Sequence, residues 1–243
     1  MTKGLPVRSR VEMGPPGDTG RHMRGCAKMA AMLRVNEIFH SIQGESTRAG
    51  EPCVFVRLTG CNLRCVWCDT AYAFHEGKPL SVDAILDEVA AYDCRLVEVT
   101  GGEPLLQDEV LPLLAALVAR GYEVMLETGG SQPIEQVPDG VRRIVDVKCP
   151  ASGESGRNRW ENIDHLRQGD ELKFVLASRE DYDWAARQIR DRGLVGRCPL
   201  LFSPVHGELD PAELAGWLLA DRLPVRLQLQ LHKQLWPAVL RGV

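Results

Sequence analysis

Apolar and polar residues alternate from residue 33 onward in a pattern that predicts strands and helices in turn. Short apolar runs bounded by turn residues predict strands at 34–39, 53–58, 96–100, 123–127, 143–147, 171–176, 199–202 and 225–231. Longer segments with apolar residues at helical spacing predict helices at 82–92, 107–120, 179–192 and 211–220, and Gly121 ends the second. Strands that alternate with helices are typical of βαβ units, so we expect a parallel sheet.

This alternation falls short of the eight units of a complete barrel. We therefore expect an α/β fold with an incomplete, TIM-like barrel whose active site lies at the carboxyl ends of the strands. Residues 32–243 show no internal repeat and no linker, and are interpreted as one domain. Residues 1–31 are rich in Gly, Pro, Arg and Met, and are interpreted as disordered or as a non-native extension from an upstream start codon.

The composition and net charge of the chain argue against nucleic acid or a membrane as a direct partner. The 243 residues are 44% apolar and 26% charged with a net charge of −4, which allows a full core but gives no attraction to nucleic acid or anionic membrane. No apolar run reaches the length of about 18 residues that a membrane span needs, and the N-terminus lacks a signal peptide. We therefore expect a cytoplasmic protein without direct nucleic-acid or membrane partners. Its eight cysteines then indicate thiol or metal chemistry rather than disulfides.

Three cysteines, Cys61, Cys65 and Cys68, lie in the segment GCNLRCVWCDT directly after the strand at 53–58. Their spacing suits a [4Fe-4S] cluster held by three thiolates, which leaves one iron open to a small molecule. Zinc with His75 as the fourth ligand, or reduced core thiols, are the alternatives, although zinc sites more often use paired C-x₂-C units. The other cysteines are scattered and are interpreted as ordinary core or surface thiols: Cys26, Cys53, Cys94, Cys149 and Cys198.

Three further strands also end in polar or glycine-rich turns. The segment TGGEP at 100–104 follows one strand, residues 127–130 follow the next, and Lys148 follows the third. Glycines allow the backbone to approach a ligand closely, and the carboxylate of Glu103 can accept a hydrogen bond from an ammonium group. Taken alone, TGGEP also fits an ordinary strand-to-helix turn in which Pro104 begins the helix.

Together, the three-cysteine loop, the aromatic residue before its last cysteine, and TGGEP resemble the radical S-adenosylmethionine superfamily, whose core is such an incomplete barrel. The resemblance implies that the amine and carboxylate of S-adenosyl-L-methionine chelate the open iron while Gly101, Gly102 and Glu103 help to hold the amine. It also implies that reduction of the cluster releases a 5′-deoxyadenosyl radical that abstracts hydrogen from the substrate.

Four segments between residues 34 and 237 resemble a narrower family, the 7-carboxy-7-deazaguanine synthases: NEIFHSIQGE, FVRLTGCNLRCVWCDT, DVKCPASGE and QLHKQLWP. The resemblance implies conversion of 6-carboxy-5,6,7,8-tetrahydropterin to 7-carboxy-7-deazaguanine and ammonia, with Mg²⁺ assisting, in queuosine and 7-deazapurine biosynthesis. It further implies a homodimer and an external electron donor such as flavodoxin.

The same resemblance implies roles for single residues. The cluster ligands are Cys61, Cys65 and Cys68, and the Mg²⁺ ligand is Thr70. The substrate-binding residues are Ile42, Gln43, Gly44, Arg57, Thr100 and Pro237. The cofactor-binding residues are Trp67, Asp69, Gly101, Gly102, Glu103, Asp146, Val147, Lys148, Ser203, Pro204, Val205 and His206. Glu127 is implied as a carboxylate close to the reacting centre, in a role that stays open.

Physical chemistry agrees with part of this assignment, because a guanidinium group suits a substrate carboxylate and an amide suits the pterin edge. Other interpretations stay open: Arg57 pairs with a protein carboxylate, Lys173 points to the barrel interior or to solvent, and His206 and His232 are structural. Trp236 is expected to have a packing role rather than to stack on the substrate. The family often ends near Pro237, whereas residues 238–243 follow here.

Two other functions share part of this sequence pattern. A glycyl-radical activase shares the spacing of the cysteines, but the SIQGE and LHKQLWP segments oppose it. A non-catalytic iron-sulfur or zinc module belongs to a different class, and anaerobic reconstitution with a test for cleavage of S-adenosylmethionine separates it from a radical enzyme.

Overall fold

A computed structural model describes residues 32–239 and 241–243, and the prediction for residues 1–31 lies outside this range. Its centre is one sheet with the strand order β3-β1-β2-β4-β5-β6-β7-β8-β9. The strands are β1 (Met32–Ile42), β2 (Pro52–Leu58), β3 (Lys78–Ser81), β4 (Leu96–Gly101), β5 (Glu123–Thr128), β6 (Val141–Lys148), β7 (Glu171–Leu176), β8 (Leu200–Pro204) and β9 (Arg226–Leu227). The α-helices are α1 (Val82–Ala90), α2 (Val110–Ala119), α3 (Arg179–Asp191), α4 (Pro211–Asp221) and α5 (Leu231–Leu235).

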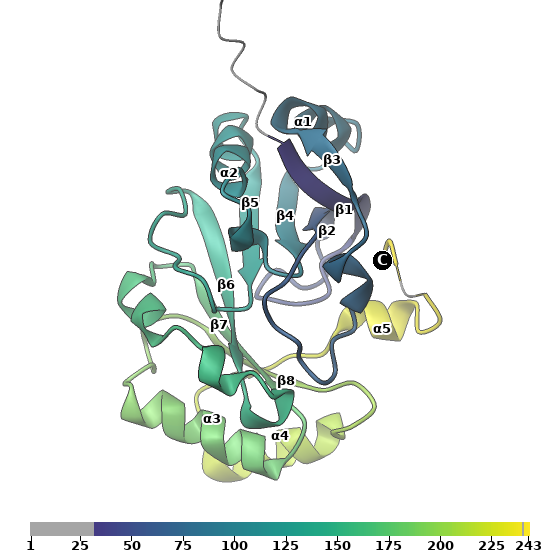
Figure 1. Cartoon of the computed structure of the whole chain (residues 1–243). Coiled ribbons are helices and arrows are strands. Elements are labelled where there is room, and N and C mark those ends of the chain that lie inside the picture. The colour runs from purple at the N-terminus through teal and green to yellow at the C-terminus, as the bar shows by residue number, and fades with distance from the viewer. Residues whose placement is uncertain (1–31, 240) are drawn as a thin grey trace, which may run out of the picture.

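The sheet is mostly parallel and does not close. Each pair of neighbours from β2 to β9 is parallel, whereas β1 pairs antiparallel with both β2 and β3. The edge strands β3 and β9 do not pair with each other, and α1 to α4 lie outside the curved sheet (Figure 1). The expected incomplete parallel barrel is therefore confirmed.

Two apolar clusters fill the two faces of this sheet. The larger one lies between the sheet and the helices and includes Val97, Leu113 and Phe174. The smaller one consists of Phe39, Cys53, Phe55, Leu96, Met125 and Ile144. Because successive side chains of a strand point to opposite faces, the smaller cluster fills the barrel interior near its base. Inward-facing polar side chains follow it toward the carboxyl ends of the strands.

Local sequence sets the helix boundaries. Ser81 begins α1 by accepting a hydrogen bond from the Ala84 amide at 3.2 Å, and Ser178 caps α3 in the same way through Asp181. Asp210 caps α4, and Pro211 occupies its first turn. These caps satisfy amides that have no partner within the helix.

Three elements differ from the expectation. The strand predicted at 225–231 is limited to Arg226–Leu227, because β9 is an edge that pairs only with Leu201 and Phe202, and α5 follows at Leu231. The helix predicted at 107–120 begins at Val110, after a 3-10 turn at Pro104–Leu106. Strand β3 was not predicted, since it is short and its residues are partly exposed. Among the described helices, none has the length and apolar character needed to cross a bilayer.

Candidate active site

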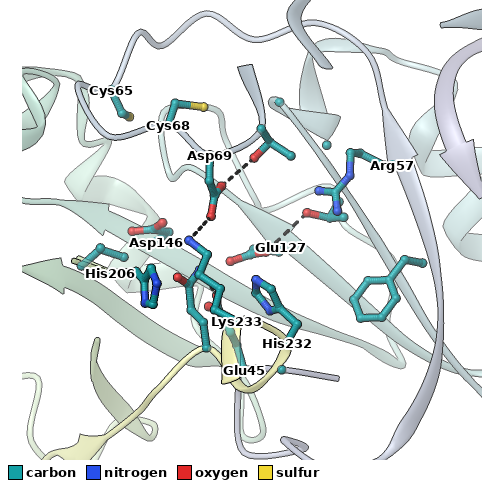
Figure 2. A pocket seen from close by; sticks show the side chains of 18 of the residues that line it. Glu45, Arg57, Cys65, Cys68, Asp69, Glu127, Asp146, His206, His232 and Lys233 are labelled. Carbon is teal, nitrogen blue, oxygen red and sulfur yellow. Dashed lines mark hydrogen bonds and ion pairs between the residues drawn. The ribbon is translucent and has the colours of Figure 1, made fainter. Parts of the chain in front are cut away.

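A cavity of about 500 Å³ opens at the carboxyl ends of the parallel strands. It is lined by the cysteine loop, by the ends of β4 to β7, by the segment after β1 and by α5. Figure 2 shows Cys65 and Cys68 on one side, Arg57 and His232 on the other, and Glu127 and Asp146 between them. The cavity therefore brings together residues from distant parts of the sequence.

The cysteine loop forms one wall of the cavity. Cys61, Cys65 and Cys68 all line it, all are half-buried, and all have free thiols. Burial raises the pKa of the Cys61 and Cys65 thiols, and Lys148 opposes this effect at both. His75, in contrast, is exposed and does not line the cavity. The structure therefore does not support a zinc site with His75 as the fourth ligand.

The turn after β4 lies against this loop. A Cβ at Gly102 would come within 2.3 Å of the Gly60 carbonyl oxygen and 2.6 Å of the Cys61 Cβ, so only glycine fits there. Glu103 is fully buried, and its carboxylate accepts hydrogen bonds from the Thr128 hydroxyl at 2.9 Å and the Gly129 amide at 2.8 Å. Burial raises the Glu103 pKa despite these donors. Glu103 therefore joins the ends of β4 and β5 and does not itself line the cavity.

Asp146 and Lys148, at the end of β6, form a charged pair beside the cysteine loop. The Lys148 ammonium donates to Asp146 Oδ2 at 2.8 Å. Asp146 Oδ1 is buried and has no hydrogen-bond partner among the described residues. A buried carboxylate oxygen without a donor is costly, and a ligand that donates a hydrogen bond would remove the cost.

These features fit a three-cysteine cluster with bound S-adenosylmethionine. The three thiols share one wall, the Gly102 backbone approaches that wall without a side chain, and Asp146 offers an unused acceptor. Among the described residues, no three His, Cys, Asp or Glu side chains converge on one point as they would for a single metal ion. A cubane cluster does not require this convergence, because each thiolate binds a different iron.

The opposite side of the cavity contains an ordered amide. The Gln43 side chain donates from Nε2 to Glu98 Oε2 and accepts the Glu45 amide at 2.9 Å through Oε1. These two bonds fix which end of the amide is the donor. Burial raises the Glu98 pKa well above its usual value, and the nearby charge of Glu127 adds to the shift. This shift favours the neutral form of Glu98, which lies beside an oriented glutamine.

Arg57 pairs with a protein carboxylate and also lines the cavity, and its role in substrate binding stays a prediction. Its Nε donates to Glu37 Oε1 at 2.7 Å, and the Tyr72 hydroxyl donates to the same oxygen at 2.9 Å. Its guanidinium lies 5.6 Å from the centre of the Phe39 ring, and the side chain lines the cavity. The protein carboxylate thus orients the guanidinium group without removing it from the cavity.

Lys173 points into the barrel. It is 5% exposed, lines the cavity, and donates hydrogen bonds to Glu45 and, at 2.6 Å, to Glu127. The Thr100 hydroxyl lies 3.4 Å from the other oxygen of Glu127. Burial alone would lower the Lys173 pKa, but Glu127, Glu45 and the nearby Asp146 raise it well above its usual value.

The C-terminal segment closes another side of the cavity. The Leu231 amide donates to the Gly44 carbonyl at 3.1 Å, which places His232 against the segment after β1. A Cβ on Gly44 would come within 2.7 Å of His232 Nδ1. Burial lowers the His232 pKa, which favours the neutral imidazole. Trp236 and Pro237 also line the cavity.

The cavity includes most of the residues that the resemblance implied. Four of them are buried and do not line it: Glu103, Val147, Ser203 and Pro204. Thr70 does line it, and its hydroxyl donates to Asp69 at 3.0 Å. Roles for all of these residues stay predictions. Of the cysteines interpreted as ordinary thiols, Cys53 and Cys149 are buried, Cys94 and Cys198 are half-buried, and Cys26 lies outside the described residues.

Besides the exposed Glu208, two acidic residues that line the cavity were not predicted, Glu98 and Glu45. Glu98 is two residues before Thr100 on the same strand, so the two-residue period of a strand places both on one face. Glu45 follows Gly44 directly. Both signals were present in the sequence, but each depends on knowing which face of the strand or loop the ligand occupies.

Comparisons with known proteins agree with this geometry. Residues 55–149 match the model of the radical SAM superfamily. A 7-carboxy-7-deazaguanine synthase of Koribacter versatilis is 48% identical over 87% of this chain and 100% of its own length. One from Chlorobaculum tepidum is 49% identical over 88% and 98%. The crystal structure of QueE from Escherichia coli has the same fold, with a TM-score of 0.69, 22% identity, and coverage of 82% of this chain and 94% of that one. The chain therefore belongs to the 7-carboxy-7-deazaguanine synthase family of radical SAM proteins.

Proposed function

We propose that this protein is a 7-carboxy-7-deazaguanine synthase. It would convert 6-carboxy-5,6,7,8-tetrahydropterin to 7-carboxy-7-deazaguanine and ammonia, for queuosine or related 7-deazapurines. The two products together contain all the atoms of the substrate, so the reaction needs no net oxidant. The strongest support is the 48% identity to a relative of that name over its full length.

The [4Fe-4S] cluster and S-adenosylmethionine, when bound, supply the radical that abstracts hydrogen from the substrate. Cys61, Cys65 and Cys68 would hold the cluster. Asp146, with its unpartnered oxygen, would accept a hydrogen bond from the cofactor. The remaining task of the chain is to bind and orient the pterin on the other side of the cavity.

Arg57 and Gln43 would carry that task. The terminal nitrogens of Arg57 donate to no acceptor within residues 32–239 and 241–243, so both suit the substrate carboxylate. The Gln43 amide is oriented by Glu98 and by the Glu45 amide, and it lines the cavity where a pterin edge would offer donors and acceptors. Glu127 would face the reacting part of the ring.

Three parts of this proposal rest on the family alone. Thr70 would provide a hydroxyl ligand to Mg²⁺, an ion that usually keeps waters and shares substrate oxygens. A second copy of the chain would complete a homodimer. An external donor such as flavodoxin would reduce the cluster.

The decisive experiment uses the full chain with its cluster reconstituted anaerobically and reduced. Given S-adenosylmethionine and 6-carboxy-tetrahydropterin, the protein should form 7-carboxy-7-deazaguanine, detected by mass spectrometry. Cleavage of S-adenosylmethionine without this product would refute the substrate and leave the superfamily intact.

A matched pair of variants tests the cluster ligands separately from turnover. Cys65→Ala should lose the iron-sulfur absorbance, whereas Cys94→Ala should keep it, because Cys94 does not line the cavity. Equal iron content in the two variants would show that the ligands are misassigned.

A further inference from the structure

One lysine links the acidic groups of the cavity. Lys173 lies in the middle of β7, and its ammonium donates to Glu45, from the segment after β1, and to Glu127, at the end of β5. Asp146 Oδ2, at the end of β6, lies 4.0 Å away. The Lys173 side chain is 6% exposed, so these interactions are weakly screened by solvent. Three elements of the barrel are thus connected through one cation.

The other oxygens of Glu45 and Glu127 also have hydrogen-bond partners. Gln230 Nε2 donates to Glu45 Oε1 at 2.7 Å. The Thr100 hydroxyl lies 3.4 Å from Glu127 Oε2. Asp146 differs, because Lys148 donates at 2.8 Å to Oδ2, the same oxygen that lies 4.0 Å from Lys173, and Oδ1 has no partner among the described residues. Glu45 and Glu127 therefore each have a second partner on the oxygen that Lys173 does not contact, which fixes the direction in which each carboxylate faces the cavity.

The charges around Lys173 do not balance without it. Three carboxylates lie within 4.0 Å of its ammonium, and Lys148 pairs with only one of them. Further groups face the same space: Glu98 from β4, His232 from α5, and the pair of Asp69 and Lys233. If Lys173 were absent, Glu45 and Glu127 would face each other as like charges in a confined cavity, and one would take up a proton at higher pH.

Building on the proposed function, we propose that Lys173 is a positioning residue for the pterin reaction. It pairs with Glu45 and Glu127 and holds both carboxylates directed toward the substrate. It also connects them, through Asp146 and Lys148, to the wall that carries the cofactor. Lys173 itself donates to protein carboxylates rather than to the substrate.

The test measures binding and turnover as functions of pH. The binding probe is 6-carboxypterin, a fluorescent oxidised analogue of the proposed substrate, titrated into protein with a reconstituted cluster. In Lys173→Met the acidic limb of both profiles should move to higher pH by about 1–3 units, because the neighbouring cation has been removed. Lys173→Arg retains a cation and should leave the limb in place. Lys78→Met, on exposed β3 outside the cavity, is the matched control and should also leave it in place.

A charge-balancing variant separates positioning from a purely structural role. Glu45→Gln added to Lys173→Met removes one of the two carboxylates that face each other. The acidic limb of the pH profiles should then return toward its wild-type position. Iron content and thermal unfolding are measured alongside each profile. An unmoved limb in folded Lys173→Met refutes the proposal. If Lys173→Met does not fold, Lys173→Arg decides: an unmoved limb supports the proposal, and an upward shift of about one unit or more refutes it.

The two proposals fail in different ways. If wild-type protein binds 6-carboxypterin and cleaves S-adenosylmethionine but makes no deazaguanine, the proposed reaction is wrong, and the binding profiles still report on Lys173. If wild-type protein makes the product and the profiles of Lys173→Met match it, only the role of Lys173 is wrong.

Discussion

Replacement of Arg57 by lysine tests how the cavity recognises its substrate. Arg57 Nε is held by Glu37 at 2.7 Å, and the side chain is 15% exposed, so the guanidinium has a fixed direction. Its two terminal nitrogens have no acceptor in the part of the chain that the structure describes, so they can form a forked pair with a carboxylate. Lysine keeps the charge but offers a single point of contact, so Arg57→Lys loses one of the two charge-assisted hydrogen bonds.

The size of the effect follows from that lost bond. A hydrogen bond to a charged group contributes about 1.5–3 kcal/mol, which corresponds to a loss in affinity of roughly 10- to 150-fold. If the contact is equally strong in ground state and transition state, KM should rise by this factor while kcat changes little. Glu37 keeps the hydrogen bond from Tyr72 but loses the one from Arg57 Nε, and this adds a smaller loss of affinity that is the same for every ligand.

The assay compares two ligands that differ only in the group in question. Binding of 6-carboxypterin and of pterin, which lacks the carboxylate, is measured by fluorescence titration. Arg57→Lys should weaken binding of 6-carboxypterin by the factor above and change the affinity for pterin little. Arg179→Lys is the control, because Arg179 is half-exposed, pairs with Asp183 and lies outside the cavity. An equal loss for both ligands, or no loss for either, would refute a carboxylate contact.

Three further predictions concern residues that support the site or stabilise the fold around it. Gly102→Ala places a Cβ 2.3 Å from the Gly60 carbonyl oxygen and should weaken binding of S-adenosylmethionine by roughly tenfold or more. Gly156→Ala, with open space around the new Cβ, should not weaken it. Equal affinities of the two variants for S-adenosylmethionine would contradict this prediction. Burial holds the folded-state pKa of Glu98 above its ordinary value of 4.5, so the free energy of unfolding falls as pH rises above that value. Glu98→Gln stays neutral, so its melting temperature should gain on the wild type from about pH 5 to about pH 8, and a constant difference would contradict the sign. Arg143→Met leaves the buried carboxylate of Asp170 without its cation and should lower the free energy of unfolding, measured in urea, by about 3–5 kcal/mol. The control Arg120→Met removes an exposed ion pair and should lower it by about 1 kcal/mol or less. Similar losses in the two variants would contradict this prediction.

The sequence predicted the parallel part of the fold because each of its signals is local. Apolar runs identified eight of the nine strands of the described residues, β9 with bounds that were too long, and helical periods identified α1 to α4, with Gly121 at the end of α2. The sequence did not indicate that β1 runs antiparallel to β2, or that the chain after β9 returns as α5. Both depend on contacts between segments far apart in the chain, such as Leu231 with Gly44.

For the site, the sequence by itself determined the chemistry of one wall. The spacing of Cys61, Cys65 and Cys68 within one loop needs no tertiary information, because neighbouring residues of a loop stay close in any fold. Only the tertiary structure decided that Glu45, Glu127 and Lys173 meet. A two-residue period shows which side chains share a face of one strand, but strand order, register and curvature decide which of them face each other across a barrel.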